Sequence, residues 1–214
     1  MDEIDDVASS PFDARTPHDI RKLIESYPLA WVHAPGLKEA SLLPLVGIHN
    51  ECNELNELIG HFARSNPLNE AFSKDSHAEI LFMGPQGYVS PSCAGRRDWA
   101  PTWNYVQARI SANISVEDEL TPAALELLIN QVEKNNDRPW SAQELGERYQ
   151  QLIPHIVGFR AQVRSVQVKF KLGQDETVKD LRHILSNLPE TPLRHWMYDF
   201  NRDRIDLAEN VRQR

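Results

Sequence analysis

The 214-residue chain lacks several features that would assign it to a class at once. No apolar run approaches the ~20 residues of a membrane-spanning helix, and the start, MDEIDDVASSPFDA, is too acidic and polar for a signal peptide. Only two cysteines occur, Cys52 and Cys93, and they are far apart and match no metal-ligand spacing. We therefore expect a cytoplasmic protein, without a membrane partner, whose cysteines are free thiols; a disulfide is the alternative.

The chain also lacks an excess of basic residues and the common catalytic motifs. Its net charge of -8 argues against a broad nucleic-acid-binding surface, although Arg96–Arg97 and the stretch around Lys169 form small basic clusters. Phosphate-binding glycine loops, HExxH, CxxC and G-x-S-x-G are absent. His49 and Cys52 are too isolated for a metal site, and no catalytic acid or base stands out, so whether the chain is an enzyme stays open.

What the chain does contain is an unusual stretch over residues 84–112. Its first half is rich in residues that break regular structure, which predicts an irregular loop: Pro85, Gly87, Pro91, Gly95 and Pro101. Apolar and polar residues then alternate over 105–116, which predicts a half-buried strand. The aromatic side chains before this strand favour either a site for a flat ligand or a partner, or a lid over the core: Tyr88, Trp99, Trp103 and Tyr105.

Periodicity and capping residues predict the remaining elements. Helices are expected to begin after Thr16, Thr121 and Ser141 and near Val178, and a short helix or a turn is expected after Asn66. Strands are expected over 29–34, 42–48, 56–62, 78–83, 105–116 and 156–172, with a phase change near Ser165 that indicates a bulge or a bend. Six or seven strands that do not alternate with helices predict an α+β fold, an antiparallel β-barrel with helical additions.

The segment GHFARSNP places His61, Arg64 and Asn66 between an expected strand and an expected helix. Backbone N–H groups are free at a helix start and can bind an anion. The residues alone favour ordinary surface groups over a phosphate site, because helix starts are common and phosphate sites are rare.

Four segments, in this order and at these spacings, resemble the PaiB-type family of FMN-binding negative transcriptional regulators: GHFARSNP, GPQGYVSPS, APTWNYVQA and IVGFRAQVRSVQVKFKLGQ. The resemblance covers roughly residues 15–190. It implies an FMN-binding split β-barrel, antiparallel and Greek-key-like with peripheral helices, similar to pyridoxamine-phosphate oxidases. It also implies a homodimer with the flavin at the interface, and a DNA-linked role by analogy only.

The same resemblance assigns cofactor-binding residues, one group for each matching segment. His61, Arg64 and Asn66 match the segment that leads to the phosphate. The central and C-terminal motifs supply the rest: Ser90, Trp103, Asn104, Tyr105, Lys169, Lys171 and Gln174. The chemistry of these residues fits FMN, because cationic side chains bind phosphate and aromatic rings stack on a flat ring system.

The chain departs from the family pattern at three places. Leu42 replaces a His, Cys93-Ala94 replaces Trp-Tyr, and Gly173 replaces a Ser. These changes remove polar or stacking groups, so flavin binding is expected to be weak or absent, or the pocket takes another ligand. Two alternative functions follow: an FMN-dependent oxidoreductase acting on a small molecule, or a degenerate barrel that holds haem or another planar group without catalysis.

The expected domain organisation has three parts. Residues 1–14 form a flexible arm, residues 15–190 form the split-barrel domain with helical insertions, and residues 191–214 form a charged C-terminal extension.

Overall fold

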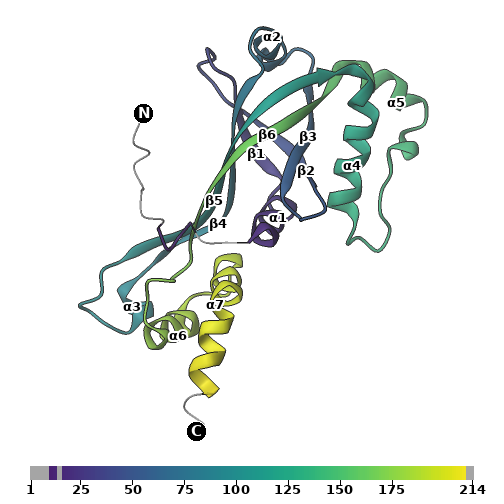
Figure 1. Cartoon of the computed structure of the whole chain (residues 1–214). Helices are drawn as coiled ribbons and strands as arrows, with labels where there is room; N and C mark the ends of the chain where they lie inside the picture. The colour runs from purple at the N-terminus through teal and green to yellow at the C-terminus, as the bar shows by residue number, and fades with distance from the viewer. Residues whose placement is uncertain (1–9, 14–15, 211–214) are drawn as a thin grey trace, which may run out of the picture. The chain divides into compact units, whose positions relative to one another are not determined.

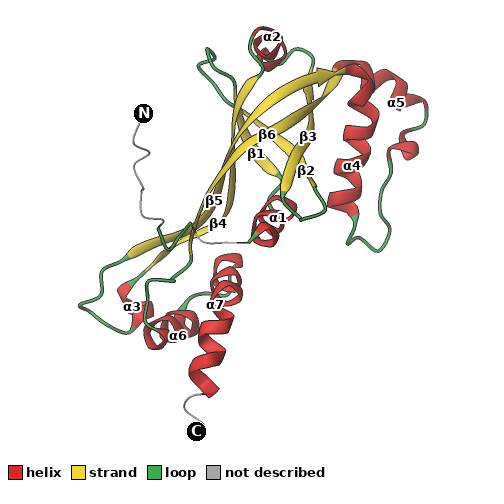
Figure 2. Cartoon of the chain, in the orientation of Figure 1, coloured by secondary structure: helices red, strands yellow, loops and turns green. Residues whose placement is uncertain are grey.

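A computed structural model describes residues 10–13 and 16–210 (Figure 1). The described residues form six strands, which Figure 2 colours yellow: β1 Leu29–His33, β2 Ser41–His49, β3 Leu55–Ala63, β4 His77–Val89, β5 Thr102–Glu117 and β6 Ile156–Lys171. The helices are α1 Pro17–Ser26, α2 Pro67–Lys74, α3 Pro91–Ala94, α4 Thr121–Glu133, α5 Glu147–Leu152, α6 Val178–Asn187 and α7 Pro192–Asn210. Three single 3₁₀ turns complete the set: η1 Asp118–Leu120, η2 Ala142–Leu145 and η3 Ile153–His155.

The strands close into a barrel in the order β1-β2-β3-β6-β5-β4. β1 pairs antiparallel with both of its neighbours, so that Trp31 lies opposite Leu42 on β2 and opposite Leu81 on β4. β3 pairs antiparallel with β6, with Gly60 opposite Phe159. The α+β barrel expected from the sequence is confirmed.

The chain divides into two compact units. Unit 1 contains Gly84–Gln107, the described residues from Val168 onward and the short segment 10–13. Unit 2 contains Thr16–Met83 and Ala108–Gln167.

Unit 2 has its core inside the strands. Phe62 and Phe159 stack with ring centroids 5.2 Å apart, and both are fully buried. A Cβ at Gly60 would lie 2.5 Å from the Leu45 side chain and 2.9 Å from the Phe159 ring, so only glycine fits there. Outside the strands, α1 buries Leu23 against the sheet, and α4 packs on β2 and β3.

Helix starts in unit 2 follow the capping signals in the sequence. The Thr16 and Asp19 side chains form a reciprocal capping box at α1. The Asn66 carboxamide caps α2 by accepting a hydrogen bond from the Leu68 amide, 3.0 Å away. Both predicted starts are confirmed.

Unit 1 packs the end of β6 against α6 and α7. The Phe170 ring lies 6.2 Å from the Trp196 ring and 5.8 Å from the Phe200 ring, measured between centroids. Met197 and the apolar side of α6 are also buried. The tail after residue 190, whose structure the sequence did not predict, therefore contains a helix with a buried apolar side.

The irregular loop predicted over the first half of 84–112 is wrong in part. β4 continues through Pro85 and Gly87 to Val89, and α3 follows. Proline lacks an N–H and is tolerated where a strand has one free edge. The β1–β4 pairs end at Phe82, so β4 needs no donor toward β1 at Pro85.

The phase change near Ser165 occurs within one continuous strand rather than between two. Val157 and Ala161 are buried in the first half of β6, whereas Val168 and Phe170 are buried in the second half. Odd-numbered residues face the core in the first half of β6, and even-numbered residues face it in the second half. The change falls next to the boundary between the two units at Val168.

Two remaining predictions concern the ends of the chain and its cysteines. Residues 1–9 and 14 of the predicted arm lie outside the described residues, while the Phe170 amide donates to the Phe12 carbonyl at 2.9 Å. Cys52 and Cys93 are both free. Within residues 10–13 and 16–210, no helix is both long enough and apolar enough to cross a membrane.

Candidate functional site

The candidate site is one exposed strand face of unit 1. Asn104 on β5 contacts Met197 of α7. Phe170 on β6 packs against the Trp196 and Phe200 rings of the same helix, so α7 covers this side of both strands. Side chains alternate along a strand, so their neighbours in sequence point to the other side. Because β5 and β6 are adjacent, this opposite face carries Trp103, Tyr105, Lys169 and Lys171.

An aromatic pair dominates this face. The Tyr88 ring on β4 lies 6.0 Å from the Trp103 ring on β5, with an interplanar angle of 53°. The indole Nε1 of Trp103 donates to Gln86 Oε1 at 2.6 Å, which fixes the ring orientation. Tyr88 and Trp103 are 52% and 53% exposed, so neither is a lid over the core. The pair presents apolar ring surface to the solvent.

By the alternation along β6, Lys169 and Lys171 lie on the side of that strand opposite Phe170. The Lys171 ammonium donates to the Thr102 hydroxyl and lies 5.9 Å from the centroid of the Phe12 ring. Neither Lys169 nor Lys171 forms an ion pair with a carboxylate of the described residues. Among the described residues no carboxylate neutralises their charge, and an anionic ligand can use it.

The other three residues assigned in unit 1 serve the fold. The buried Asn104 amide donates to Met197 Sδ at 3.5 Å, and its Oδ1 has no hydrogen-bond partner among the described residues. The Ser90 hydroxyl caps α3, and the Gln174 side chain bonds the backbone of Leu172 at 2.7 Å and that of Phe170. Asn104, which faces α7, therefore does not share the face of the aromatic pair.

The assigned residues in unit 2 lie at the junction of β3 and α2. Arg64 Nε donates to the Pro154 carbonyl at 2.9 Å, and its terminal nitrogen pairs with Asp118 Oδ1 at 2.6 Å. Asn66 bonds the Ser41 hydroxyl in addition to capping α2. The helix start is thus capped by the chain itself, and the guanidinium already has a carboxylate partner.

His61 on β3 is largely buried. Burial lowers its pKa, because the charged imidazolium loses hydration that no nearby group replaces. Its Nδ1 is enclosed and has no hydrogen-bond partner among the described residues. We therefore expect a neutral imidazole at pH 7.

Unit 2 also presents an exposed apolar strand face. Leu29, Trp31 and Leu42 are each about half exposed, and Trp31 lies directly opposite Leu42 across the β1–β2 pair. Beside them is a shallow cavity of about 240 Å³ lined by Trp31, His33, Glu79, Ile80, Leu81 and Arg109. Large apolar side chains grouped in this way mark an interaction surface more often than an ordinary solvent-exposed face.

A sequence model of the family described as "Putative FMN-binding domain" matches residues 8–165. The chain belongs to this family. The match covers nearly all of unit 2 and, in unit 1, the aromatic pair, and it ends before the two lysines of β6. The resemblance found in the sequence is therefore confirmed at the level of the family.

The chain is similar in sequence to the protease synthase and sporulation protein PAI 2 of Bacillus subtilis. It is 29% identical over 153 residues, which are 69% of this chain and 73% of the relative.

Solved structures with the same fold include an FAD and haem binding protein from Mycobacterium smegmatis, with a TM-score of 0.55 and 15% identity over 79% of this chain and 78% of that one. A conserved hypothetical protein from Mycobacterium tuberculosis has a TM-score of 0.52 and 12% identity over 76% of this chain and 89% of that one. At such identities the likeness concerns the fold alone.

Sequence reasoning missed Gln86 and the contact between Tyr88 and Trp103. The expected loop over Tyr88 concealed the strand that carries this side chain. Extending β4 past Pro85 would have placed Gln86 and Tyr88 on one side, because they are two residues apart.

Proposed function

We propose that the chain binds FMN on the face formed by Tyr88, Trp103, Tyr105 and the two lysines, and that it does so as a homodimer. The family match supports the ligand, and the exposed aromatic pair is the observation that carries the site. A flat ring system gains most binding free energy from exposed aromatic surface of fixed orientation. A phosphate gains most binding free energy from cations that lack a carboxylate partner.

The individual side chains have distinct tasks in this proposal. Trp103, oriented by Gln86, stacks on the flavin ring, and Tyr88 closes one edge of it. Lys169 and Lys171 bind the phosphate, for which Lys171 gives up a neutral hydroxyl partner. A bound flavin would supply redox chemistry to this site.

Arg64 is the weaker candidate for the phosphate. It would have to leave both Asp118 and the Pro154 carbonyl before it could bind an anionic ligand. The Asn66 side chain is likewise engaged, because it accepts from the Leu68 amide at the start of α2. We therefore assign these two residues to the fold of unit 2 and the phosphate to unit 1.

The homodimer contact that we propose is the apolar strand face of unit 2. Trp31, Leu29 and Leu42 are exposed on it, and a second copy would remove this apolar surface from water. Trp31→Lys places a charge at the centre of the face and should give a monomer in light scattering coupled to size exclusion.

The matched control is Leu207→Lys, since Leu207 is 66% exposed on α7 in the other unit. This variant should keep the wild-type mass. A Trp31→Lys protein that stays dimeric, or a wild-type protein that is monomeric at all concentrations, would contradict the proposed contact.

The experiment for the ligand is a fluorescence titration of the purified protein with FMN, riboflavin, FAD and haem. The proposal predicts saturable quenching of flavin fluorescence and weaker binding of riboflavin, which lacks the phosphate. Trp103→Leu should weaken both FMN and riboflavin, because the lost stacking is independent of the phosphate. Base-stacking contacts with aromatic side chains are worth about 1–3 kcal/mol, which corresponds to about fivefold to 150-fold in affinity.

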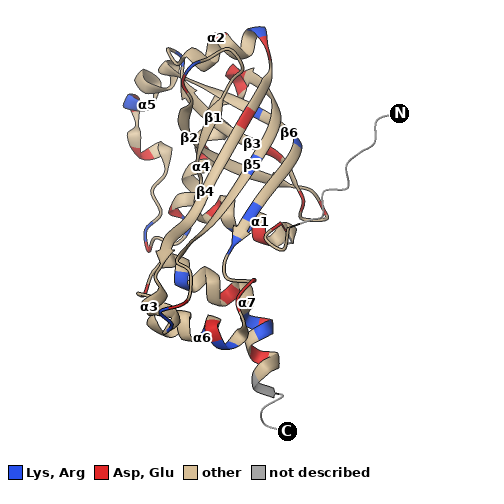
Figure 3. Cartoon of the chain, turned by 90° about the vertical axis from the view of Figure 1, so that its left-hand side faces the viewer, with Lys and Arg blue, Asp and Glu red and all other residues tan. Residues whose placement is uncertain are grey.

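The regulatory role implied by the family resemblance is a separate proposal. Blue and red segments alternate along α6 and α7 in Figure 3, so these helices do not form a continuous basic surface. Any effect on transcription would then depend on a local contact or on another protein rather than on a broad basic face. Mobility shift with a random DNA duplex at low salt should show no binding; tight, salt-sensitive binding would refute this reasoning.

A further inference from the structure

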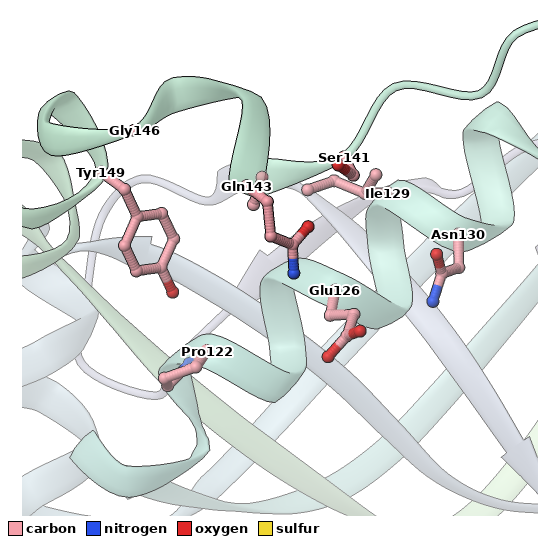
Figure 4. A pocket seen from close by; sticks show the side chains of 9 residues that line it. Pro122, Glu126, Ile129, Asn130, Ser141, Gln143, Gly146 and Tyr149 are labelled. Atoms are coloured by element: carbon pink, nitrogen blue, oxygen red, sulfur yellow. The ribbon is translucent and has the colours of Figure 1, made fainter.

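The segment between β5 and β6 in unit 2 forms a cavity that the flavin proposal does not use. α4 forms one wall, and η2 and α5 form the other (Figure 4). The cavity has a volume of about 390 Å³, within the range of about 300–1,000 Å³ that is usual for small-molecule sites. It is lined by Pro122, Glu126, Ile129, Asn130, Ser141, Ala142, Gln143, Gly146 and Tyr149.

Local hydrogen bonds hold the two walls in place. Glu133, at the end of α4, accepts from the Trp140 amide at 3.2 Å and from the Asn136 amide group at 2.5 Å, which ties the connecting segment to the helix. The Ser141 and Glu144 capping box then fixes the start of η2. The cavity is therefore built by ordered elements rather than by a free loop.

The polar side chains that line the cavity all offer hydrogen-bond acceptors. Glu126 is the only charged side chain in the lining, and within residues 10–13 and 16–210 its carboxylate has no hydrogen bond or ion pair. Figure 4 shows Gln143 and Tyr149 reaching from the opposite wall toward α4, where Glu126 and Asn130 lie. Carboxylate, amide and hydroxyl oxygens all accept hydrogen bonds.

We propose that this cavity binds a small organic primary amine with an apolar body. An ammonium group donates three hydrogen bonds and accepts none, which suits the Glu126 carboxylate and the amide and hydroxyl oxygens of the lining. Ile129, Pro122 and the Tyr149 ring supply apolar surface for the body of the ligand. A flavin phosphate or another anion is repelled by Glu126, so this site and the proposed flavin site take ligands of opposite charge.

The test uses isothermal titration of the full-length protein with three probes of similar shape: 2-phenylethylammonium, 2-phenylethanol and phenylacetate. The amine should bind saturably, and the neutral and anionic probes should bind at least about tenfold more weakly, because a hydrogen bond to a charged group is lost. The same order should hold with and without FMN, so the result does not depend on whether the flavin proposal is correct.

Glu126→Gln should weaken the amine about tenfold and leave the alcohol unchanged. Glu147→Gln is the matched control, because Glu147 is exposed on α5 and does not line the cavity. Circular dichroism checks that both variants fold, and the probe series on the wild type decides the charge preference without any variant. Equal binding of amine and carboxylate, an unchanged amine affinity in Glu126→Gln, or no saturable heat up to about 10 mM amine would overturn the proposal.

Discussion

The sharpest functional prediction compares Lys171 with Arg64 as the partner of the FMN phosphate. Lys171→Met and Arg64→Met both remove a cation and keep a long apolar side chain. Among the residues that the structure describes, Lys171 bonds only a neutral hydroxyl and lies beside the Phe12 ring. Arg64 is bonded to the Asp118 carboxylate at 2.6 Å and to a backbone carbonyl. The two substitutions therefore test the two units separately.

The expected magnitudes follow from these partners. A charge-assisted hydrogen bond to phosphate is worth about 1.5–3 kcal/mol, and Lys171 gives up about 0.5–1.5 kcal/mol when it leaves Thr102. The net of about 1–1.5 kcal/mol predicts that Lys171→Met weakens FMN about five- to twelvefold. Arg64→Met should change FMN affinity by less than about threefold and should cost at most about 1 kcal/mol of stability, because the pair with Asp118 is exposed.

The assay is quenching of FMN fluorescence at low salt, repeated with riboflavin. Riboflavin should bind both variants as it binds the wild type, because it lacks the phosphate that the cations recognise. The reasoning is refuted if Arg64→Met weakens FMN as strongly as Lys171→Met does, or if Lys171→Met leaves the ratio of FMN to riboflavin affinity unchanged.

Three further predictions concern stability. Gly158→Ala should lower the free energy of unfolding by about 1–3 kcal/mol in urea denaturation, since a Cβ there would lie 2.9 Å from the Thr121 backbone nitrogen; an unchanged midpoint would show that the segment can move away. Burial lowers the pKa of His61 below 6.5, so the unfolded chain binds a proton that the folded chain resists, and stability should fall as the pH drops below about 6.5. His61→Gln should remove part of that loss between about pH 6.5 and pH 5, measured as the change in unfolding midpoint, and an identical pH profile would contradict the assignment. Thr177→Ala removes the hydroxyl that accepts from the Asp180 amide at 3.1 Å, and should cost about 1 kcal/mol in the same assay, whereas Thr177→Ser keeps a capping hydroxyl and should retain most of the stability.

Much of the fold could be predicted because its signals are local. The alternation over 105–116 specified β5, and Thr16 and Asn66 specified two helix starts, since capping and strand periodicity depend on residues close in sequence. The extension of β4 through Pro85 was missed, because proline is permitted there only by the end of the β1 pairing at Phe82. That condition is a matter of strand pairing, which no local pattern contains.

The candidate site could be predicted in part for the same reason. The sequence placed Trp103 and Tyr105 at a strand entrance, and the family resemblance added Lys169 and Lys171. It could not show that Asp118 neutralises Arg64, since the pairing partner lies more than fifty residues away along the chain. Nor could it separate Asn104, which faces α7, from the neighbours that face the solvent.

Flavin binding by the exposed aromatic face is decided by one titration. The purified protein is titrated with FMN while the fluorescence of the flavin and the emission of tryptophan are both recorded, for the wild type and for Trp103→Leu. The account predicts saturable binding by the wild type and a clear loss of affinity in Trp103→Leu, whose far-UV circular dichroism stays the same because Trp103 is 53% exposed. A wild-type protein that shows no saturable binding up to about 100 µM FMN, or a Trp103→Leu variant that binds as tightly as the wild type, would contradict it.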